Sequence, residues 1–424
     1  MRVLLVSANR EDGDMRVPAL GMASVGAAAE RAGHDTRLLD LMIETEPRRA
    51  LEKAIADFGP DAIGISVRNI DNQCMRHPRF LLDQARDAVA LCREASAAPI
   101  ILGGAGYSIL PGPILEYLGA DMGIAGEGER GFPELLARIG AGLDPGALPG
   151  LYRAGGEGGA PCAYVQDLDE LPLPDPRLLA RSLAGAADAP VPVQSRRGCP
   201  LACSYCSTPT IEGRIVRRRS PEAVVDWMAR WTAEGFRRFY FVDNTFNLPA
   251  DYAADLCGAI LRARLDVDWR CILVPVDLTP ELAELMARAG CREVSLGFES
   301  GSAALLRGMG KPYDPVEVRL ASERLRHAGI ARMGFLLLGG PGETEATARE
   351  SLDFAESLEL ESLMITIGVR IYPGTDVARF ARGEGVISSD AELLHPRFYM
   401  ARGLEDRLHA LAAERQSRNP GWIL

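Results

Sequence analysis

Short apolar runs alternate with longer amphipathic stretches through the first third of the 424-residue chain. Apolar runs bounded by turn residues are typical of buried strands, and the stretches between them have the apolar spacing of helices. Strands and helices in alternation favour a parallel sheet that helices cover. The pattern therefore predicts an α/β fold that begins with a doubly wound, flavodoxin-like (Rossmann-type) domain over residues 1–140. Its expected strands lie at residues 3–6, 36–39, 62–66, 99–102 and 122–125.

A second alternating region predicts a partial (β/α)6 TIM-like barrel over residues 191–376, in which functional groups gather at the carboxyl ends of the strands. The residues between the two regions, 141–190, are rich in glycine, proline and alanine and are interpreted as a linker. Residues 377–424 are expected to form a helical cap that closes one end of the barrel or shapes the substrate pocket. The helices expected in the barrel span 221–233, 280–289 and 315–328.

Composition and charge narrow the classes of function. Hydrophobic residues make up 47% of the chain, which is enough for two cores, and single domains seldom grow past about 300 residues. The net charge of −11 argues against a nucleic-acid partner. Charge comes early in the N-terminal sequence and no apolar run approaches about 18 residues, so we expect neither a signal peptide nor a membrane partner. A cytoplasmic enzyme with reduced thiols is the expectation.

Three cysteines, Cys199, Cys203 and Cys206, have the spacing C-x3-C-x2-C. A structural zinc site takes four protein ligands, and a [4Fe-4S] cluster has four iron corners that each take a ligand. Three thiolates leave one iron open for a substrate or cofactor. The alternatives are a zinc site with a distant fourth ligand, or unpaired core cysteines. The other six of the 9 cysteines show no second spacing of this kind and are expected to be buried thiols.

The triplet, with Tyr205 just before its third cysteine, resembles the cluster motif of the radical S-adenosylmethionine (SAM) enzymes. The resemblance implies that Cys199, Cys203 and Cys206 bind a [4Fe-4S] cluster and that Tyr205 lies at the cofactor site. In this family the open iron chelates the amino and carboxylate groups of SAM, and an electron from the cluster can cleave the sulfonium to a 5'-deoxyadenosyl radical. An external electron donor of the flavodoxin or ferredoxin type is implied as a partner.

Segments after three later strands are similar to the family's SAM-binding segments. Asp243 and Asn244 stand where the family binds the amino end of SAM, although Asp243 also suits the cap of a turn. Glu299 and Ser300 match the fourth-strand segment, where a carboxylate suits the ribose hydroxyls. A buried pair with an arginine is the alternative for Glu299. Gly339 begins a segment like the one that pairs with adenine, and it equally suits a tight turn.

Two further residues are candidates for catalysis. Tyr372 follows Arg370 in a segment that resembles the family's sixth strand, and both side chains are expected to face the cavity. Arg68 follows the third strand of the first domain. A loop ion pair with Asp71 is the alternative reading of Arg68.

Glycine-rich turns follow the fourth and fifth strands of the first domain, where a doubly wound fold binds its ligands. Glycine lets a backbone approach a bulky ligand, but such turns are weak evidence by themselves. Their position before a radical SAM motif resembles the cobalamin-binding subclass of the superfamily, which implies cobalamin as the ligand. The residues expected to hold it are Gly103, Gly104, Gly106, Gly126, Glu127 and Gly128.

The sequence departs from many cobalamin proteins in lacking the motif D-x-H-x-x-G, whose histidine replaces the base of cobalamin. The resemblance to members without it implies a lower cobalt face that is empty or bound by water. Arg68 is the candidate for a cation near that face, where it would disfavour an axial ligand.

The resemblance implies a cobalamin-dependent radical SAM methyltransferase. One SAM methylates cobalt, a second yields the radical that removes hydrogen from the substrate, and the methyl group passes to an unactivated carbon, or less often to phosphorus, of a small molecule or natural-product intermediate. The enzyme alternatives are a rearrangement or cyclisation without methylation, and a non-radical methylation of an aromatic carbon. A cluster-bearing binding protein is a third alternative. A methylthiotransferase would bring a second cysteine triplet in the first domain, where only Cys74 and Cys92 occur.

Overall fold

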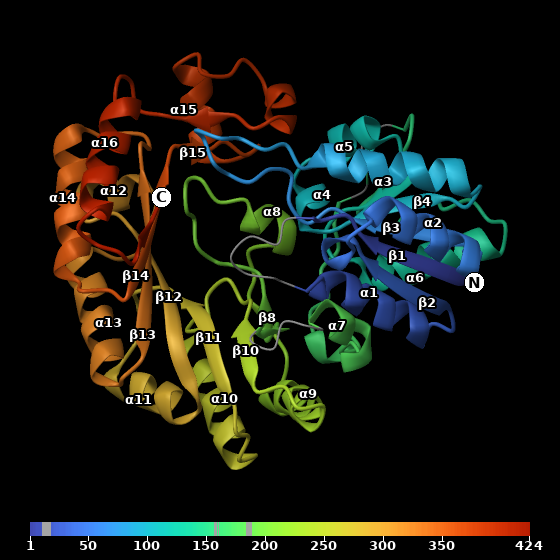
Figure 1. The fold of residues 1–424 in the computed structure, drawn as a ribbon, viewed down its shortest axis with the longest axis horizontal. Helices are drawn as coiled ribbons and strands as arrows, with labels where there is room; N and C mark the ends of the chain where they lie inside the picture. The colour runs from blue at the N-terminus through green and yellow to red at the C-terminus, as the bar shows by residue number, and fades with distance from the viewer. Residues whose placement is uncertain (11–17, 157–158, 160, 184–188) are drawn as a thin grey trace. The chain divides into compact units, whose positions relative to one another are not determined.

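The computed structural model describes residues 1–10, 18–156, 159, 161–183 and 189–424. The chain forms two compact units (Figure 1). The first comprises Met1–Asn72, Arg79–Ala189 and Thr210–Gly213, and the second comprises Gln73–Pro78, Pro190–Pro209 and Arg214–Leu424.

The first unit is built on a six-stranded sheet of order β2-β1-β3-β4-β5-β6. Its first five strands are parallel, and their order is that of flavodoxin-like folds. β1 and β3 are buried along almost their whole length, as expected for parallel strands covered on both faces. The doubly wound prediction is confirmed. The strands are β1 (Arg2–Ser7), β2 (Asp35–Asp40), β3 (Ala62–Ser66), β4 (Ile100–Gly103), β5 (Met122–Ile124) and β6 (Leu151–Arg153).

Helices of the first unit pack in groups, α1 against α6 and α2 against α3, and α5 also packs on α3. The core under α6 gathers Phe132, Leu135 and Leu136 against Val3 and Leu5 of β1. The helices are α1 (Leu20–Arg31), α2 (Pro47–Phe58), α3 (Leu82–Ala95), α4 (Ala105–Ile109), α5 (Pro111–Leu118), α6 (Gly128–Gly140) and α7 (Pro176–Leu183), with 3-10 turns η1 (Leu41–Ile43) and η2 (Leu168–Glu170).

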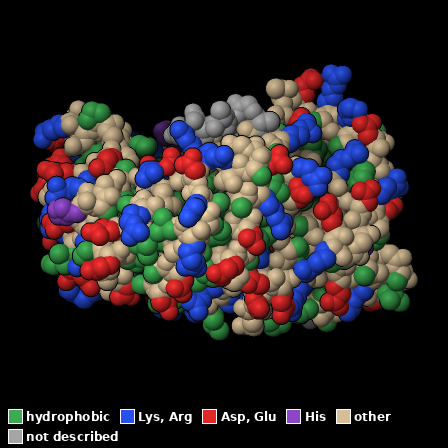
Figure 2. All heavy atoms as spheres, turned by 90° about the horizontal axis from the view of Figure 1, so that it is seen from below, with side chains coloured by type: hydrophobic (Ala, Val, Ile, Leu, Met, Phe, Trp, Pro, Cys, Tyr) green, Lys and Arg blue, Asp and Glu red, His purple; other side chains and the backbone are tan. Residues whose placement is uncertain are grey.

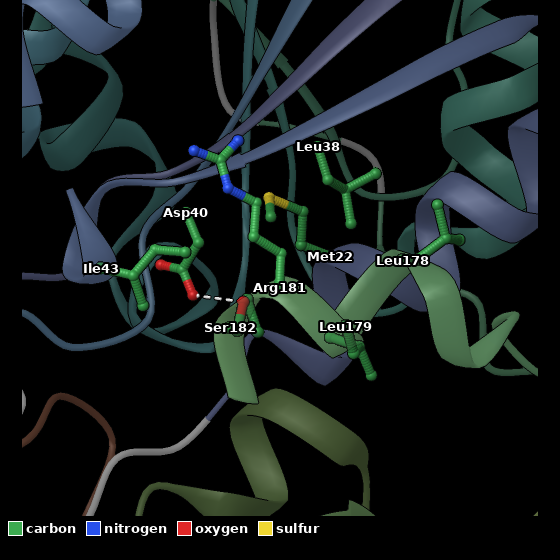
Figure 3. Close-up of a pocket in the computed structure, with 9 residues that line it drawn as sticks. Met22, Leu38, Asp40, Ile43, Leu178, Leu179, Arg181 and Ser182 are labelled. Carbon is green, nitrogen blue, oxygen red and sulfur yellow. Dashed lines mark hydrogen bonds between the residues drawn. The ribbon is translucent and has the colours of Figure 1, made fainter. Parts of the chain in front are cut away.

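The segment interpreted as a linker contributes structure to the first unit. β6 pairs antiparallel with β5, so it covers an edge that would otherwise expose unpaired backbone groups. Further along, α7 is tied to the end of β2, because the Ser182 hydroxyl donates to an Asp40 carboxylate oxygen at 2.8 Å and both side chains are buried (Figure 3). These elements are short and lie among glycines and prolines, which is why their periodicity was too brief to detect.

The second unit has a seven-stranded parallel sheet of order β17-β14-β13-β12-β11-β10-β7. Six consecutive strands with helices between them confirm the partial barrel. β17, from the end of the chain, adds a seventh strand beside β14. The strands are β7 (Val191–Val193), β10 (Arg238–Phe241), β11 (Asp268–Leu273), β12 (Cys291–Glu299), β13 (Ala331–Leu338), β14 (Ser362–Ile367) and β17 (Trp422–Ile423), and two small antiparallel pairs are β8 (Arg196–Arg197) with β9 (Arg217–Arg218) and β15 (Val369–Arg370) with β16 (Phe398–Tyr399).

Three helices of this unit begin with proline after a serine, threonine or aspartate cap, at Ser220, Thr279 and Asp314. A cap side chain satisfies a free backbone N–H, and proline suits the first helical position. Figure 1 shows α11, α13 and α14 along one side of the curved sheet. The helices are α8 (Thr208–Glu212, shared between the units), α9 (Pro221–Ala233), α10 (Ala250–Arg262), α11 (Pro280–Arg288), α12 (Ala303–Gly308), α13 (Pro315–His327), α14 (Glu345–Ser357), α15 (Asp376–Gly383) and α16 (Glu405–Gln416), with the 3-10 turn η3 (Asp390–Leu394).

The C-terminal segment is an integral part of the second unit. α16 packs on α14, where Arg415 pairs with Asp353 at 2.5 Å and with Glu356. The short segment Gln73–Pro78 also belongs to this unit. Its Met75 packs so closely on Gly368 that a Cβ there would lie 2.3 Å from the methionine sulfur. None of the helices in the described ranges has the length and apolarity to cross a membrane.

Candidate cofactor-binding sites

The three cysteines of the triplet lie in the loop between β8 and α8, with Cys199 buried and Cys203 and Cys206 partly exposed. Burial raises the pKa of Cys199 and of Cys203, and the neighbouring Cys206 raises both further. Lys311 acts in the opposite direction on both thiols. The thiols are therefore near enough to one another to interact, and a cation beside them favours the thiolate form that binds iron.

Backbone contacts hold this cysteine loop in a turn. The N–H of Cys206 donates to the carbonyl of Cys203 at 3.2 Å, and the N–H of Thr208 donates to the Cys206 sulfur at 3.4 Å. The Thr208 hydroxyl in turn donates to the side-chain oxygen of Asn244 at 3.4 Å. Asn244 is thereby joined to the loop, and N–H donation to a cysteine sulfur is one of the interactions that tune an iron–sulfur cluster.

The chemistry of these donors fits a [4Fe-4S] cluster. Within the part of the chain that the structure describes, no three His, Cys, Asp or Glu side chains are grouped to hold a single metal ion. A four-iron cluster binds each thiolate at a different iron, so its ligands need not converge on one point. Three thiols can supply ligands to such a cluster, and an N–H donor to one sulfur and a nearby cation suit its negative charge. Ligation by Cys199, Cys203 and Cys206 stays a prediction.

A buried lysine joins Tyr205 to Glu299. The Lys311 ammonium donates to the Tyr205 hydroxyl at 2.9 Å and to Glu299 Oε1 at 3.3 Å. Burial lowers the pKa of Lys311, but Glu299 and the neighbouring tyrosines more than offset it, so the pKa lies well above the usual value. Glu299 has φ +65°, a backbone conformation that costs energy outside glycine and clusters at functional sites. The expected alternative partner for Glu299 was an arginine, and the structure supplies a lysine.

Asp243 is fully buried and follows the end of β10 by two residues. Its oxygens accept from the Ser195 N–H at 2.8 Å and hydroxyl at 2.5 Å and from the Arg196 N–H at 3.1 Å, and Arg196 Nε lies 3.6 Å away. Burial raises the pKa of Asp243, and Arg196 and Ser195 oppose that rise. These contacts give the carboxylate a structural role in attaching β8 to β10. Its contact with the amino end of SAM stays a prediction.

Ser300 and Gly339 have structural contacts of their own. The Ser300 hydroxyl lies 2.8 Å from that of Ser351 on α14 and accepts from the Ser302 N–H at 3.0 Å. Gly339 has φ +91°, and a Cβ there would lie 2.8 Å from the side chain of Met400. The glycine is therefore required by the turn, which is the second of the two interpretations considered for it. Glu343, a buried carboxylate that accepts from the Gly339 N–H at 3.3 Å, was not detected from the sequence.

Arg370 and Tyr372 support the β15–β16 pair. The Arg370 guanidinium donates to the carbonyls of Ile371 at 2.6 Å and Leu393 at 2.9 Å, and it lies 5.1 Å from the centre of the Tyr372 ring. Both side chains are buried. Arg370 thus holds the chain in place rather than offering its charge to solvent, and the catalytic role of Tyr372 stays a prediction.

In the first unit, the turn after β4 is packed against the loop that carries Arg68. A Cβ on Gly104, which has φ +102°, would lie 2.6 Å from the carbonyl oxygen of Val67, and one on Gly106 would lie 2.9 Å from that of Arg68. The backbone of Val67 and Arg68 lies so close to these two glycines that a side chain would not fit. The sequence predicts that a ligand makes such an approach, whereas here the protein's own backbone makes it. Gly103 differs, because a Cβ there would meet nothing closer than 3.8 Å.

The turn after β5 is attached to the same edge. The Ser108 hydroxyl accepts from the Gly126 N–H at 2.9 Å and donates to the Gly104 carbonyl at 2.8 Å. Glu127 accepts from the Val165 N–H at 2.8 Å, and Gly128 begins α6. The predicted cobalamin turns therefore meet at the carboxyl edge of one sheet, where this fold binds ligands, with space beside Gly103. This fits cobalamin, although binding by the individual residues stays a prediction.

A small pocket in the first unit contains none of these residues. Figure 3 shows it beside α7, lined by Met22, Leu38, Asp40, Leu179 and neighbouring side chains. Its volume of about 20 Å³ is near the room for one water molecule. It is a packing defect at the α7 junction rather than a cofactor site.

Comparisons with known proteins agree with this architecture. The radical SAM superfamily matches residues 193–355, and the B12 binding domain matches residues 10–136. A protein of Pyrococcus horikoshii named as an uncharacterized methyltransferase is 28% identical over 90% of this chain and 83% of its own length. The tryptophan 2-C-methyltransferase of Streptomyces laurentii is 25% identical over 83% of this chain and 70% of its own length.

Among solved structures, the radical SAM methyltransferase TsrM from Kitasatospora setae, with cobalamin and a [4Fe-4S] cluster bound, has a TM-score of 0.86 at 23% identity and covers 100% of this chain and 90% of its own. This similarity shows the fold. A B12 binding domain followed by a radical SAM barrel with a cysteine triplet defines a class of enzymes that combine radical SAM chemistry with cobalamin. The chain belongs to the cobalamin-binding radical SAM enzymes. The predicted family and its cofactors, a [4Fe-4S] cluster, SAM and cobalamin, are confirmed.

Proposed function

We propose that this enzyme is a cobalamin-dependent methyltransferase that moves a methyl group from SAM, by way of cobalamin, to an unactivated carbon of a small molecule. The observation that carries the proposal is that one chain contains both cofactor domains and aligns over 90% of its length with a protein named as a methyltransferase. When bound, the two cofactors supply electron transfer to SAM and carriage of the methyl group.

The chain's own residues hold and orient these groups. Cys199, Cys203 and Cys206 would hold the cluster, and the N–H of Thr208 donates to one of the sulfurs. Glu299, which accepts a hydrogen bond from Lys311, would present a carboxylate oxygen to the ribose hydroxyls of SAM. In the first unit, Arg68 would bring a cation near cobalt. A positive charge there would disfavour a second cation beside the bound cobalamin, and the cobalamin would supply carriage of the methyl group.

For the substrate we propose a small natural-product intermediate or an amino-acid-like molecule, and for the partner an external ferredoxin or flavodoxin in the reducing cytoplasm. A second candidate function is methylation of an aromatic carbon without a free substrate radical. It is favoured by the alignment of 83% of this chain with a tryptophan 2-C-methyltransferase. The two candidates differ in whether 5'-deoxyadenosine accompanies the methylated product.

The first experiment measures the cofactors of the anaerobically reconstituted protein after incubation with hydroxocobalamin and gel filtration. We expect about four irons and stoichiometric cobalamin per chain. A Cys203→Ala variant is expected to lose iron and keep cobalamin, because the two ligand sets lie in different units. Iron without cobalamin would contradict methyl transfer through cobalamin and leave a radical SAM enzyme of another kind.

A further inference from the structure

The distribution of lysine in this chain draws attention to one side chain. Of the 47 basic residues other than histidine, only two are lysines, Lys53 and Lys311. Lys53 lies exposed on α2 and pairs with Asp57 at 2.6 Å, with 72% of its side chain accessible. Lys311 lies in the second unit and is 6% accessible. Almost all basic residues of this chain are arginines, yet the buried position beside the cysteine loop is occupied by a lysine.

Backbone packing delivers this lysine to the cysteine loop. The Ser204 N–H donates to the carbonyl of Met309 at 2.9 Å. Gly310 has φ +70°, and a Cβ there would lie 2.5 Å from the carbonyl oxygen of Ala202. Met309 and Gly310 thus approach the loop as closely as glycine allows, and Lys311 is the next residue.

The Lys311 ammonium is surrounded by hydrogen-bond acceptors and aromatic rings, which stabilise a small positive charge. It donates to Tyr205 and Glu299, and it lies 5.2 Å from the centre of the Tyr205 ring and 5.8 Å from that of Tyr313. The Tyr313 ring is fixed because its hydroxyl donates to the Gly297 carbonyl at 2.6 Å. An ammonium has three donors on one small atom, whereas a guanidinium spreads its charge over a wide planar fork. The enclosure therefore explains why arginine is not used here.

We propose that Lys311 is a positioning residue of the cofactor site with two effects. It holds the Glu299 carboxylate in the orientation that SAM requires, and its charge favours the reduced state of the adjoining cluster. The second effect follows because an electron from the ferredoxin- or flavodoxin-type donor adds negative charge beside three thiolates and Glu299. A buried cation nearby offsets that charge more strongly than one in water. The inference rests on the proposed function for the presence of the cluster.

The test compares Lys311→Met with the matched control Lys53→Met, which removes the other lysine and changes the net charge equally. Both proteins are reconstituted, their iron is quantified, and the midpoint potential of the cluster is determined by electron paramagnetic resonance during redox titration. We expect a more negative potential in Lys311→Met and about a tenfold rise in the Kd for SAM, equivalent to one lost charged hydrogen bond. Lys53→Met is expected to match the wild type in both readouts.

Two further variants separate charge from packing. Lys311→Arg keeps the charge and is expected to keep the potential near that of the wild type while weakening SAM binding. Glu299→Gln removes the negative partner, so its potential is expected to move to a more positive value. A Lys311→Met protein with a full cluster, unchanged potential and unchanged SAM affinity would overturn the inference. If Lys311→Met takes up no iron, its potential cannot be measured, and the test then depends on Glu299→Gln. A Glu299→Gln protein whose midpoint potential is not more positive than that of the wild type would overturn the inference. A wild type that forms no cluster refutes the proposed function itself.

Discussion

At the scale of single residues, Asp243 and Arg196 form an ion pair with 0% and 1% of their side chains exposed. Asp243→Asn would leave the buried guanidinium of Arg196 without its counter-ion. We expect a loss of about 3 kcal/mol in the free energy of unfolding, measured by chemical denaturation. Asp268→Asn, which breaks the exposed pair with Arg292, is expected to cost less than about 1 kcal/mol. A folded, stable Asp243→Asn enzyme that binds SAM poorly would instead assign the carboxylate to the cofactor.

Gly310 supports a second residue-level prediction. Gly310→Ala places a side chain at φ +70° and within 2.5 Å of the Ala202 carbonyl oxygen. Gly403→Ala has a similar φ of +72° but meets nothing within 4 Å, so it carries the backbone cost of about 1 kcal/mol alone. Calorimetry is expected to show a larger loss for Gly310→Ala, accompanied by lower iron uptake. Equal losses would mean that residues 309–311 can withdraw from the cysteine loop.

At the scale of elements, α14 and α16 are joined by exposed ion pairs that respond to pH. The hydrogen bonds from Arg407 and Arg349 lower the pKa of Glu345 from its ordinary value of 4.5 to about 2. A carboxylate with a lowered pKa in the folded state adds stability above the pKa of the unfolded chain and loses it as the pH falls through the folded value. The Tm of the wild type is therefore expected to exceed that of Glu345→Gln at pH 6, with the difference shrinking from pH 4.5 toward 2. A difference that grows on acidification would refute this.

The strands and helices were largely predictable from the sequence, because parallel strands buried on both faces give uninterrupted apolar runs. β6, α7 and β17 were missed, since two or three strand residues, or two helical turns among prolines, carry too little periodicity. The residues of the site were predictable only where they lie close together in the sequence with a recognisable spacing, as in the cysteine triplet. Lys311 escaped detection because its partners Tyr205 and Glu299 come from other segments. For Gly104 and Gly106, the sequence did not reveal that the backbone of Val67 and Arg68 lies against them.

At the scale of the whole molecule, the predicted sites of the cluster and of cobalamin lie in different units. A ligand that binds only the folded state stabilises it by mass action. Saturating hydroxocobalamin is therefore expected to slow amide hydrogen exchange in the turns after β3, β4 and β5 of the first unit. Removing iron by chelation is expected to speed exchange around residues 199–208 of the second. Exchange measured by mass spectrometry checks both, and slowing by cobalamin confined to β12 and β13 would contradict the predicted site.

The two units are not continuous stretches of sequence. Gln73–Pro78, encoded between β3 and α3 of the first unit, is built into the second, and Thr210–Gly213, from α8, is built into the first. A gene fusion that joined this barrel to another N-terminal domain would discard Met75 and open a hole at Gly368. Such an exchange would need compensating substitutions within each unit. The pair is therefore expected to diverge as one inherited block, with few recombinants in which either half has been replaced alone.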